Sequence, residues 1–148
     1  ALRQTVRPLQ ERSGQGGRLD AEGRRLVELR AMEVAKKWLV QQGYTVKDKS
    51  SNHPYDLEAN RADGVLKIEV KGTTSDSASA LLMTRNEVDL HRQEKGTTGL
   101  LVVSQIGLRD VEGSRRAEGG VLEVFLPWDI DGWTATPTAF RLEKQTGN

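Results

Sequence analysis

The sequence has no cysteine, only two histidines and no long apolar run. Without cysteine there are no disulfides, thiolate zinc sites or cysteine nucleophiles, and two histidines are too few for a histidine-rich metal site. No apolar stretch approaches the roughly 18 residues of a membrane-spanning helix. The N-terminal residues lack the apolar core of a secretory signal. We therefore expect a cytoplasmic protein with no membrane association.

The 148 residues suffice for one domain, which we place at residues 21–148. Residues 1–20 are predicted to be a flexible basic tail or linker, because Gly14, Gly16 and Gly17 disfavour a regular element. The tail is a solvated leader or contacts a DNA backbone. With 22 basic and 21 acidic residues, the net charge of +1 neither predicts nor excludes a nucleic-acid partner.

The hydrophobic pattern predicts helices and short strands in alternation. A helix over residues 20–42 has Asp20 as its cap, an amphipathic apolar stripe and Gly43 after its end. A second helix over residues 84–93 opens with a capping box. We expect strands at residues 44–46, 55–59, 65–71, 81–83, 99–106 and 121–125, and an exposed loop at 108–120. This order predicts an α/β sandwich with a mixed sheet covered on both faces.

The residues that carry chemistry are Asp56, Glu69 and Lys71. Side chains two apart on a strand share a face, so Lys67, Glu69 and Lys71 point the same way, and Asp56 lies on the neighbouring strand of the hairpin. Two carboxylates held close together repel each other, and a divalent cation such as Mg²⁺ relieves that repulsion. A surface hairpin with alternating charges gives the same pattern.

Glu28 is a fourth candidate. On a helical wheel Glu28 lies about 60° from the centre of the apolar stripe, whereas Glu33 lies about 200° away, where Lys37 can pair with it. We therefore expect Glu28, and not Glu33, to point toward the carboxylates. The alternative is a rim residue paired with Arg24 or Arg25.

Four blocks of sequence occur in an order that resembles a known family. They are PYDLEA at 54–59, IEVKGTT at 68–74, LLMTRNEV at 81–88 and LLVVSQI at 100–106. With the first helix and the terminal PWDI and ATPTAF segments, they resemble the C-terminal domain of the NO VEIN family over about residues 24–140. That family resembles the PD-(D/E)XK nuclease superfamily. The resemblance implies a restriction-endonuclease-like sandwich with a central mixed β-sheet flanked by helices.

The resemblance also implies a role for each candidate residue. Asp56 and Glu69 would bind Mg²⁺ or Mn²⁺, with the main-chain carbonyl of Val70 as a third ligand. Lys71 would orient or deprotonate the attacking water, or stabilise charge on the phosphate. Glu28 would hold a metal-bound water or a second ion. One departure is that Pro54 precedes Asp56 by two positions rather than one, a variant that occurs within the family.

Weaker candidates surround this set. His53 touches substrate or is simply solvated, and Gly72, Thr73 and Thr74 present amides and hydroxyls to a phosphate or form a plain polar turn. Glu87 matches a family block, and its place in the capping box is a sufficient structural role. Two tryptophans stack on bases or, as we expect, cover the core: Trp128 and Trp133.

The leading hypothesis is a Mg²⁺-dependent endonuclease-like domain that hydrolyses DNA phosphodiester bonds within a larger restriction or phage-defence protein. The alternative is a non-catalytic nucleic-acid-binding or protein-interaction module on the same fold. Few cations lie outside the tail, so we expect the domain to rely on additional domains or on a second copy to hold DNA.

Overall fold

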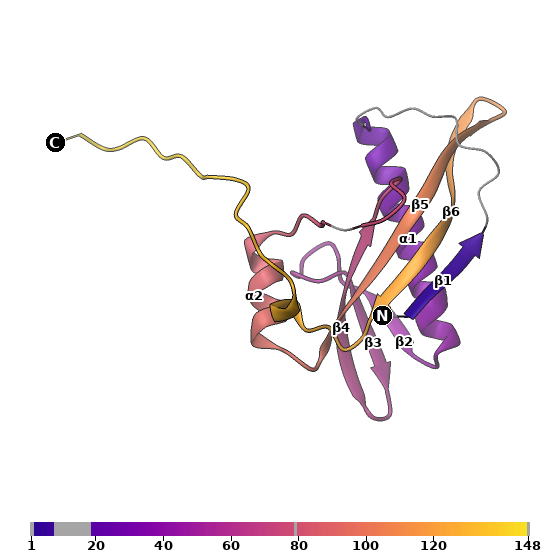
Figure 1. The fold of residues 1–148 in the computed structure, drawn as a ribbon, viewed down its shortest axis with the longest axis horizontal. Coiled ribbons are helices and arrows are strands. Elements are labelled where there is room, and N and C mark those ends of the chain that lie inside the picture. Colours follow the sequence, from indigo (N-terminus) through magenta and orange to yellow (C-terminus); the bar gives the residue numbers. More distant parts are fainter. Residues whose placement is uncertain (1, 8–18, 79, 148) are drawn as a thin grey trace.

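The computed structural model describes residues 2–7, 19–78 and 80–147 (Figure 1). Its strands form one six-stranded sheet in the order β1-β6-β5-β4-β3-β2. Strands β4 and β5 are parallel, and every other neighbouring pair is antiparallel. The elements are β1 (Leu2–Arg7), α1 (Ala21–Gln41), β2 (Thr45–Asp48), β3 (Leu57–Arg61), β4 (Gly64–Gly72), α2 (Arg85–Gln93), β5 (Thr98–Val111), β6 (Ser114–Phe125) and the 3-10 turn η1 (Ile130–Gly132). The prediction of an α/β protein with a mixed sheet between helices is confirmed.

Helix α1 covers one face of the sheet. Asp20 caps it by accepting a 2.7 Å hydrogen bond from the Gly23 amide, and the helix ends before Gly43, whose φ of +91° suits glycine. Both boundaries lie within one residue of the prediction. The buried side of α1 packs on a core formed by alternate strand residues, which include Leu57, Ile68 and Leu101.

The opposite face of the sheet carries a smaller core. Its buried members are Leu100, Val102, Trp128 and Ile130, and Val88 of α2 packs against them. Successive strand residues point to opposite faces, so the two cores use alternate positions of β5. Helix α2 and the turn η1 therefore lie across the sheet from α1, as Figure 1 shows.

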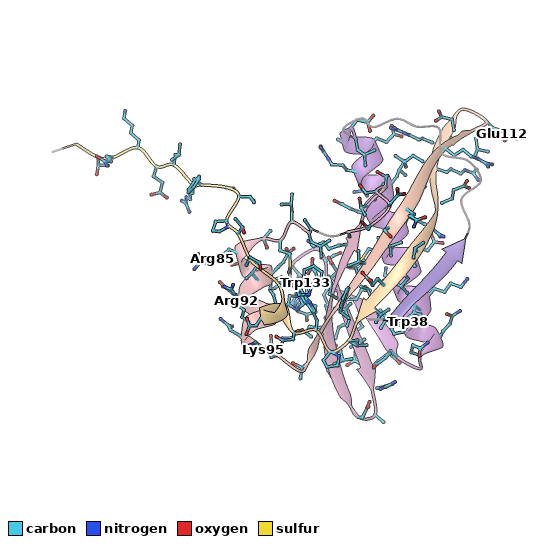
Figure 2. The ribbon with its side chains drawn as sticks, in the orientation of Figure 1. Trp38, Arg85, Arg92, Lys95, Glu112 and Trp133 are labelled. Carbon is cyan, nitrogen blue, oxygen red and sulfur yellow. The ribbon has the colours of Figure 1, made fainter. Side chains whose placement is uncertain are left out.

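The segment 108–120, predicted to be an exposed loop, is instead the outer half of the β5–β6 hairpin. The strands meet at Glu112 and Gly113, whose φ values of +51° and +79° suit a tight hairpin turn. Figure 2 shows Glu112 at the tip of this hairpin. Leu108 and Ala117 are partly buried against the α1 core. The prediction failed because the charged residues of a strand with one face in solvent look like a loop in sequence.

Two further expectations were wrong. Residues 2–7, assigned to the tail, form β1 and pair with the edge of β6 in antiparallel register. Residues 81–83 form no strand, and the chain there runs irregularly into α2. The rest of the predicted tail, 8–18, and its suggested DNA contact lie outside the described residues. In the described residues, no helix is long and apolar enough to cross a membrane.

Gly72 allows α1 to approach the end of β4 closely. A Cβ atom at Gly72 would lie 2.7 Å from Cβ of Ala31 and 3.1 Å from the carbonyl oxygen of Val27, and neither atom can swing away. The substitution Gly72→Ala is expected to lower the free energy of unfolding by about 1–3 kcal/mol in urea denaturation. Gly132→Ala, where a Cβ meets open space, is the matched control and should change it by less than about 0.5 kcal/mol. Equal effects of the two changes would contradict this packing.

Candidate active site

Asp56 lies where the β3–β4 ladder ends. The last paired residues are Leu57 and Ile68, so Asp56 and Glu69 come next on the two strands. The Asp56 amide donates to the Ile68 carbonyl at 2.9 Å, and Oδ2 of Asp56 accepts from the Val70 amide at 2.8 Å. The side chain thus replaces a missing ladder partner, which fixes its carboxylate beside β4.

Glu69 and Lys71 lie on the α2 face of β4. Glu69 is 1% exposed, and its Oε1 lies 3.1 Å from Nζ of Lys71. The other oxygen, Oε2, is buried and has no hydrogen-bond partner in the described part of the chain. Burial at this level excludes the surface-hairpin alternative for Glu69. Lys67, on the same face, pairs with Glu94 at 2.9 Å instead.

The two carboxyl groups hold protons unusually tightly. Burial, and then the negative charge of Asp56, raise the pKa of Glu69 to about 8. Burial also raises the pKa of Asp56, although the hydrogen bond from the Val70 amide opposes it. Desolvation penalises the charged form of an acid, and a neighbouring carboxylate adds to that penalty. Near neutral pH and without a cation, Glu69 is therefore mostly protonated.

Lys71 remains charged. Burial lowers its pKa, but the charges of Glu69, Glu87 and Asp56 together outweigh burial and raise it above the ordinary value. An ammonium stabilised in this way is a poor general base. Its chemistry is to donate hydrogen bonds and to stabilise negative charge.

Sequence reasoning missed Glu87 as a member of this cluster. The predicted capping box is confirmed: Oε2 of Glu87 accepts from the Thr84 amide at 2.7 Å, and the Glu87 amide donates to Oγ1 of Thr84 at 3.2 Å. The same Oε2 lies 3.5 Å from Nζ of Lys71. The cap therefore aims a second carboxylate at the lysine. The sequence signal for Glu87 was its place in the family block LLMTRNEV. Its role in the capping box seemed a sufficient reason for a glutamate at that position.

His91 is buried one turn after Glu87. It is fully inaccessible, and neither ring nitrogen has a hydrogen-bond partner among the described residues. Its ring packs edge-on against Trp128 with centroids 4.7 Å apart. Burial lowers the pKa of His91 to about 4, so the ring is neutral near pH 7.

A groove of about 1240 Å³ passes around the end of β4. It brings α1 and the carboxylates onto one surface, and its lining includes Glu28, Asp56, Glu69, Lys71 and Glu87. Glu28 is exposed, since it extends from the helix on the other face of the sheet. In the described residues it forms no ion pair with Arg24 or Arg25, and its role remains a prediction.

Glu33, expected in solvent beside Lys37, also lines the groove. Its side chain is 70% exposed, as the helical wheel indicated. It pairs at 2.9 Å with Arg30, three residues earlier on the same helix, where a pair with Lys37 was expected.

Two carboxylates, those of Asp56 and Glu69, are the candidate metal ligands. Among the described residues, no group of three or more His, Asp or Glu side chains is arranged to hold an ion. Asp56 and Glu69 supply hard oxygen ligands, and the partnerless Oε2 of Glu69 is a free acceptor position. The pair therefore fits a divalent cation that obtains its other ligands from main chain, water or substrate.

Of the weaker candidates, three line the groove and His53 does not. Gly72, Thr73 and Thr74 line the groove, but the Thr73 amide already donates to the Val103 carbonyl at 2.9 Å. That amide is therefore not available to a phosphate. His53 is exposed and is not among the lining residues; its ring packs on Tyr55 with centroids 5.3 Å apart.

The tryptophans cover the core, as expected. Trp128 is 3% exposed within the α2-face core, and Trp133 packs edge-on against it with centroids 5.7 Å apart. Trp128 therefore has no face free for base stacking.

Comparison with known proteins gives one match. The model of the family described as "Protein NO VEIN, C-terminal" matches residues 27–112. The matched segment contains all the residues of the cluster: Asp56, Glu69, Lys71 and Glu87. No curated protein and no solved structure matches the chain.

The raised pKa of Glu69 predicts a pH dependence of stability. The pKa of Glu69 is about 8 in the folded state and 4.5 ordinarily, so the folded state binds the proton more tightly than the unfolded state. The resulting stabilisation is fully present below pH 4.5 and is lost as the pH rises through 8. His91, whose pKa falls from 6.5 to about 4, acts in the opposite direction below pH 6.5. Between pH 6.5 and 8, without divalent cations, the free energy of unfolding should fall by up to about 1.4 kcal/mol per pH unit. Urea denaturation measures it.

Glu69→Gln should flatten this slope, since an amide does not titrate. Glu58 lies on β3 and on the same face of the sheet as Glu69, since it pairs with Lys67. Glu58→Gln is therefore the matched control and should keep the slope of the wild type. An unchanged slope in Glu69→Gln would show that another group titrates.

Proposed function

The chain belongs to the NO VEIN C-terminal domain family, and we propose that it is a metal-dependent endonuclease-like domain that hydrolyses DNA phosphodiester bonds. The observation that carries the proposal is the buried meeting of Asp56, Glu69 and Lys71 at the end of β4. Burying two carboxylates and an ammonium is costly unless they pair with one another or serve a ligand. On this proposal the mixed sheet between helices is a restriction-endonuclease-like sandwich.

Asp56 and Glu69 would hold Mg²⁺ or Mn²⁺, and the Val70 carbonyl is the nearest main-chain candidate. When bound, such an ion lowers the pKa of a water molecule and neutralises charge on a phosphate. The Val70 amide fixes one oxygen of Asp56, so its other oxygen remains for ligation. Glu69 must lose its proton first, which a nearby positive charge favours.

Lys71 would stabilise the negative charge that develops on the phosphate in the transition state. Its raised pKa favours this role over deprotonation of water. Glu87 would act as a positioning residue, because it holds Nζ from the side of α2 at 3.5 Å. A substrate oxygen can replace one of these carboxylates as the partner of the ammonium.

The charge of the groove lining predicts only modest affinity for DNA. The groove is lined by the cations Arg24, Arg25, Lys36 and Lys71, and by six carboxylates: Glu28, Glu33, Asp48, Asp56, Glu69 and Glu87. Since phosphate contacts supply most non-specific affinity, the chain would need further domains of a larger polypeptide, such as a restriction or phage-defence protein, or a second copy.

One observation favours a second candidate function. Lys71 already pairs with Glu69 and Glu87, so the cluster is partly satisfied without a ligand. A nucleic-acid-binding or protein-interaction module that performs no catalysis would have the same ion pairs. Cleavage and binding must therefore be measured separately.

Plasmid cleavage tests the proposal. With Mg²⁺ or Mn²⁺ the chain should nick supercoiled DNA, and excess EDTA should stop it. Lys71→Ala should slow cleavage by about 10²-fold or more, because charge on the phosphate loses its stabilising partner. Lys67→Ala is the matched control: it lies on the same face of β4 but pairs with Glu94, and it should cleave within a few-fold of wild type.

Binding of the same DNA is measured in Ca²⁺, which binds to oxygen ligands but activates water less. Lys71→Ala should bind nearly as wild type. Cleavage that persists in EDTA, or equally in Lys71→Ala and Lys67→Ala, would overturn the proposal. Binding without cleavage by the wild type would favour the second candidate.

A further inference from the structure

The segment of residues 73–77 begins two residues after Lys71 and forms part of the groove wall. Four of its residues line the groove, and each carries a hydroxyl group: Thr73, Thr74, Ser75 and Ser77. In the part of the chain that the structure describes, the amides and hydroxyls of Thr74 and Ser77 form no hydrogen bond with another residue. Neutral amide and hydroxyl donors of this kind contact phosphate oxygens in protein–DNA complexes.

Strand β5 holds this segment in place. The β4–β5 ladder ends where β4 ends, but β5 continues past it into the hairpin with β6 (Figure 1). There the Gln105 amide donates to the Ser75 carbonyl at 2.8 Å, and Nε2 of Gln105 donates to the Asp76 carbonyl at 3.3 Å. The Ile106 amide donates to the Thr73 carbonyl at 3.2 Å. Three hydrogen bonds from β5 therefore fix the backbone of the segment.

These contacts depend on an unusual backbone conformation at Gln105. Its φ is +58°, and no other non-glycine residue within the described strands has a positive φ. In a regular strand successive amides point to opposite edges, whereas the amides of Gln105 and Ile106 both donate to the segment 73–77. The left-handed conformation makes this possible. A residue other than glycine keeps such a conformation where its surroundings hold it, and strained residues of this kind cluster at functional sites.

We propose that Gln105 is a positioning residue for the hydrolysis proposed above, and this inference rests on that function. Gln105 holds the segment 73–77 against β5, which keeps the donors of Thr74 and Ser77 in the groove. There they bind a phosphate group of the DNA strand that adjoins the one cleaved beside Lys71. Because these donors do not touch the reacting atoms, they stabilise bound substrate and transition state alike. Their loss should therefore raise KM and leave kcat nearly unchanged.

Two valine substitutions that impose the same strain at different places test the proposal. A β-branched residue is strongly disfavoured at positive φ, so Gln105→Val and Glu112→Val should both lower the midpoint of urea denaturation. Glu112, with a φ of +51°, lies at the tip of the hairpin and does not line the groove. Gln105→Val should raise KM for DNA cleavage at least about 10-fold and change kcat less than about 3-fold. Glu112→Val should keep the KM of Glu112→Gln, which removes the same charge.

Gln105→Asn is the conservative rescue. Asparagine adopts positive φ more readily than most residues, so the main-chain hydrogen bonds to the segment should remain. Its KM should lie within about 3-fold of the wild-type value, since only the bond from Nε2 is lost. A role in stability alone would lower the urea midpoint of Gln105→Val without raising its KM.

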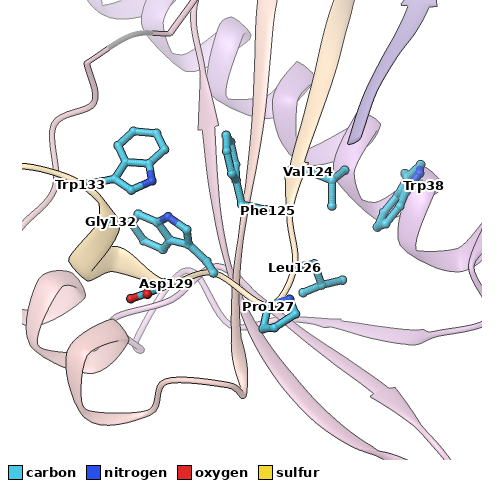
Figure 3. Close-up of a pocket in the computed structure, with 9 residues that line it drawn as sticks. Trp38, Val124, Phe125, Leu126, Pro127, Asp129, Gly132 and Trp133 are labelled. Atoms are coloured by element: carbon cyan, nitrogen blue, oxygen red, sulfur yellow. The ribbon is translucent and has the colours of Figure 1, made fainter. Parts of the chain in front are cut away.

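Removal of the hydroxyls tests the same wall without backbone strain, and it decides the question if Gln105→Val does not fold. Thr74→Ala combined with Ser77→Ala should raise KM at least about 5-fold. The control adds a hydroxyl to another cavity, of about 450 Å³ at the end of β6, which shares no lining residue with the groove (Figure 3). A Cβ at Gly132 of that cavity meets open space, so Gly132→Ser should fold normally and leave KM unchanged.

Affinity for the same DNA, measured in Ca²⁺, separates this inference from the proposed function. If the wild type cleaves DNA while Gln105→Val and the double alanine variant keep its KM, the inference is wrong and the proposed function stands. If the wild type binds DNA without cleaving it, the proposed function is wrong. The inference is then decided by affinity, which Gln105→Val and the double variant should weaken and Glu112→Val should not. A wild type that neither binds nor cleaves DNA would overturn both.

Discussion

The candidate site depends on one constraint: a glutamate buried opposite an aspartate where a β-ladder ends. Asp56 accepts the amide of Val70 in place of a strand partner, and Glu69 is buried beside it. The positions follow from the strand register, so neither group can move away without breaking the hairpin. Their mutual repulsion must therefore be relieved by a proton, by Lys71 or by a bound cation.

Much of the fold could be predicted from local signals. The Asp20 cap, Gly43 and the apolar stripe defined α1 within one residue, and the period of two in β4 gave its faces correctly. The outer half of the β5–β6 hairpin could not be predicted in this way. One of its faces is in solvent, and its extended structure depends on the pairing of the two strands with each other. Strand β1 likewise exists through its pairing with β6.

The carboxylate pair followed from sequence, but its surroundings did not. Alternation shows that Glu69 and Lys71 share a face, yet it does not show which helix covers that face. The face proved to be that of α2, so Glu87 completes the cluster, while Glu28 reaches the groove only around the end of β4. The capping role of Glu87 explained that residue locally, so its contact with Lys71 was not predicted. A sequence gives no distance between residues far apart in the chain.

The most direct test of the account is proton release on metal binding. Mg²⁺ is titrated into the chain calorimetrically at pH 7 in two buffers of different ionisation enthalpy. With a pKa of about 8, Glu69 is mostly protonated before binding, so the account predicts release of about one proton per ion. Glu69→Gln should release none and bind more weakly. Binding without proton release, or no binding by the wild type, would contradict the claim that this buried pair is a cation site.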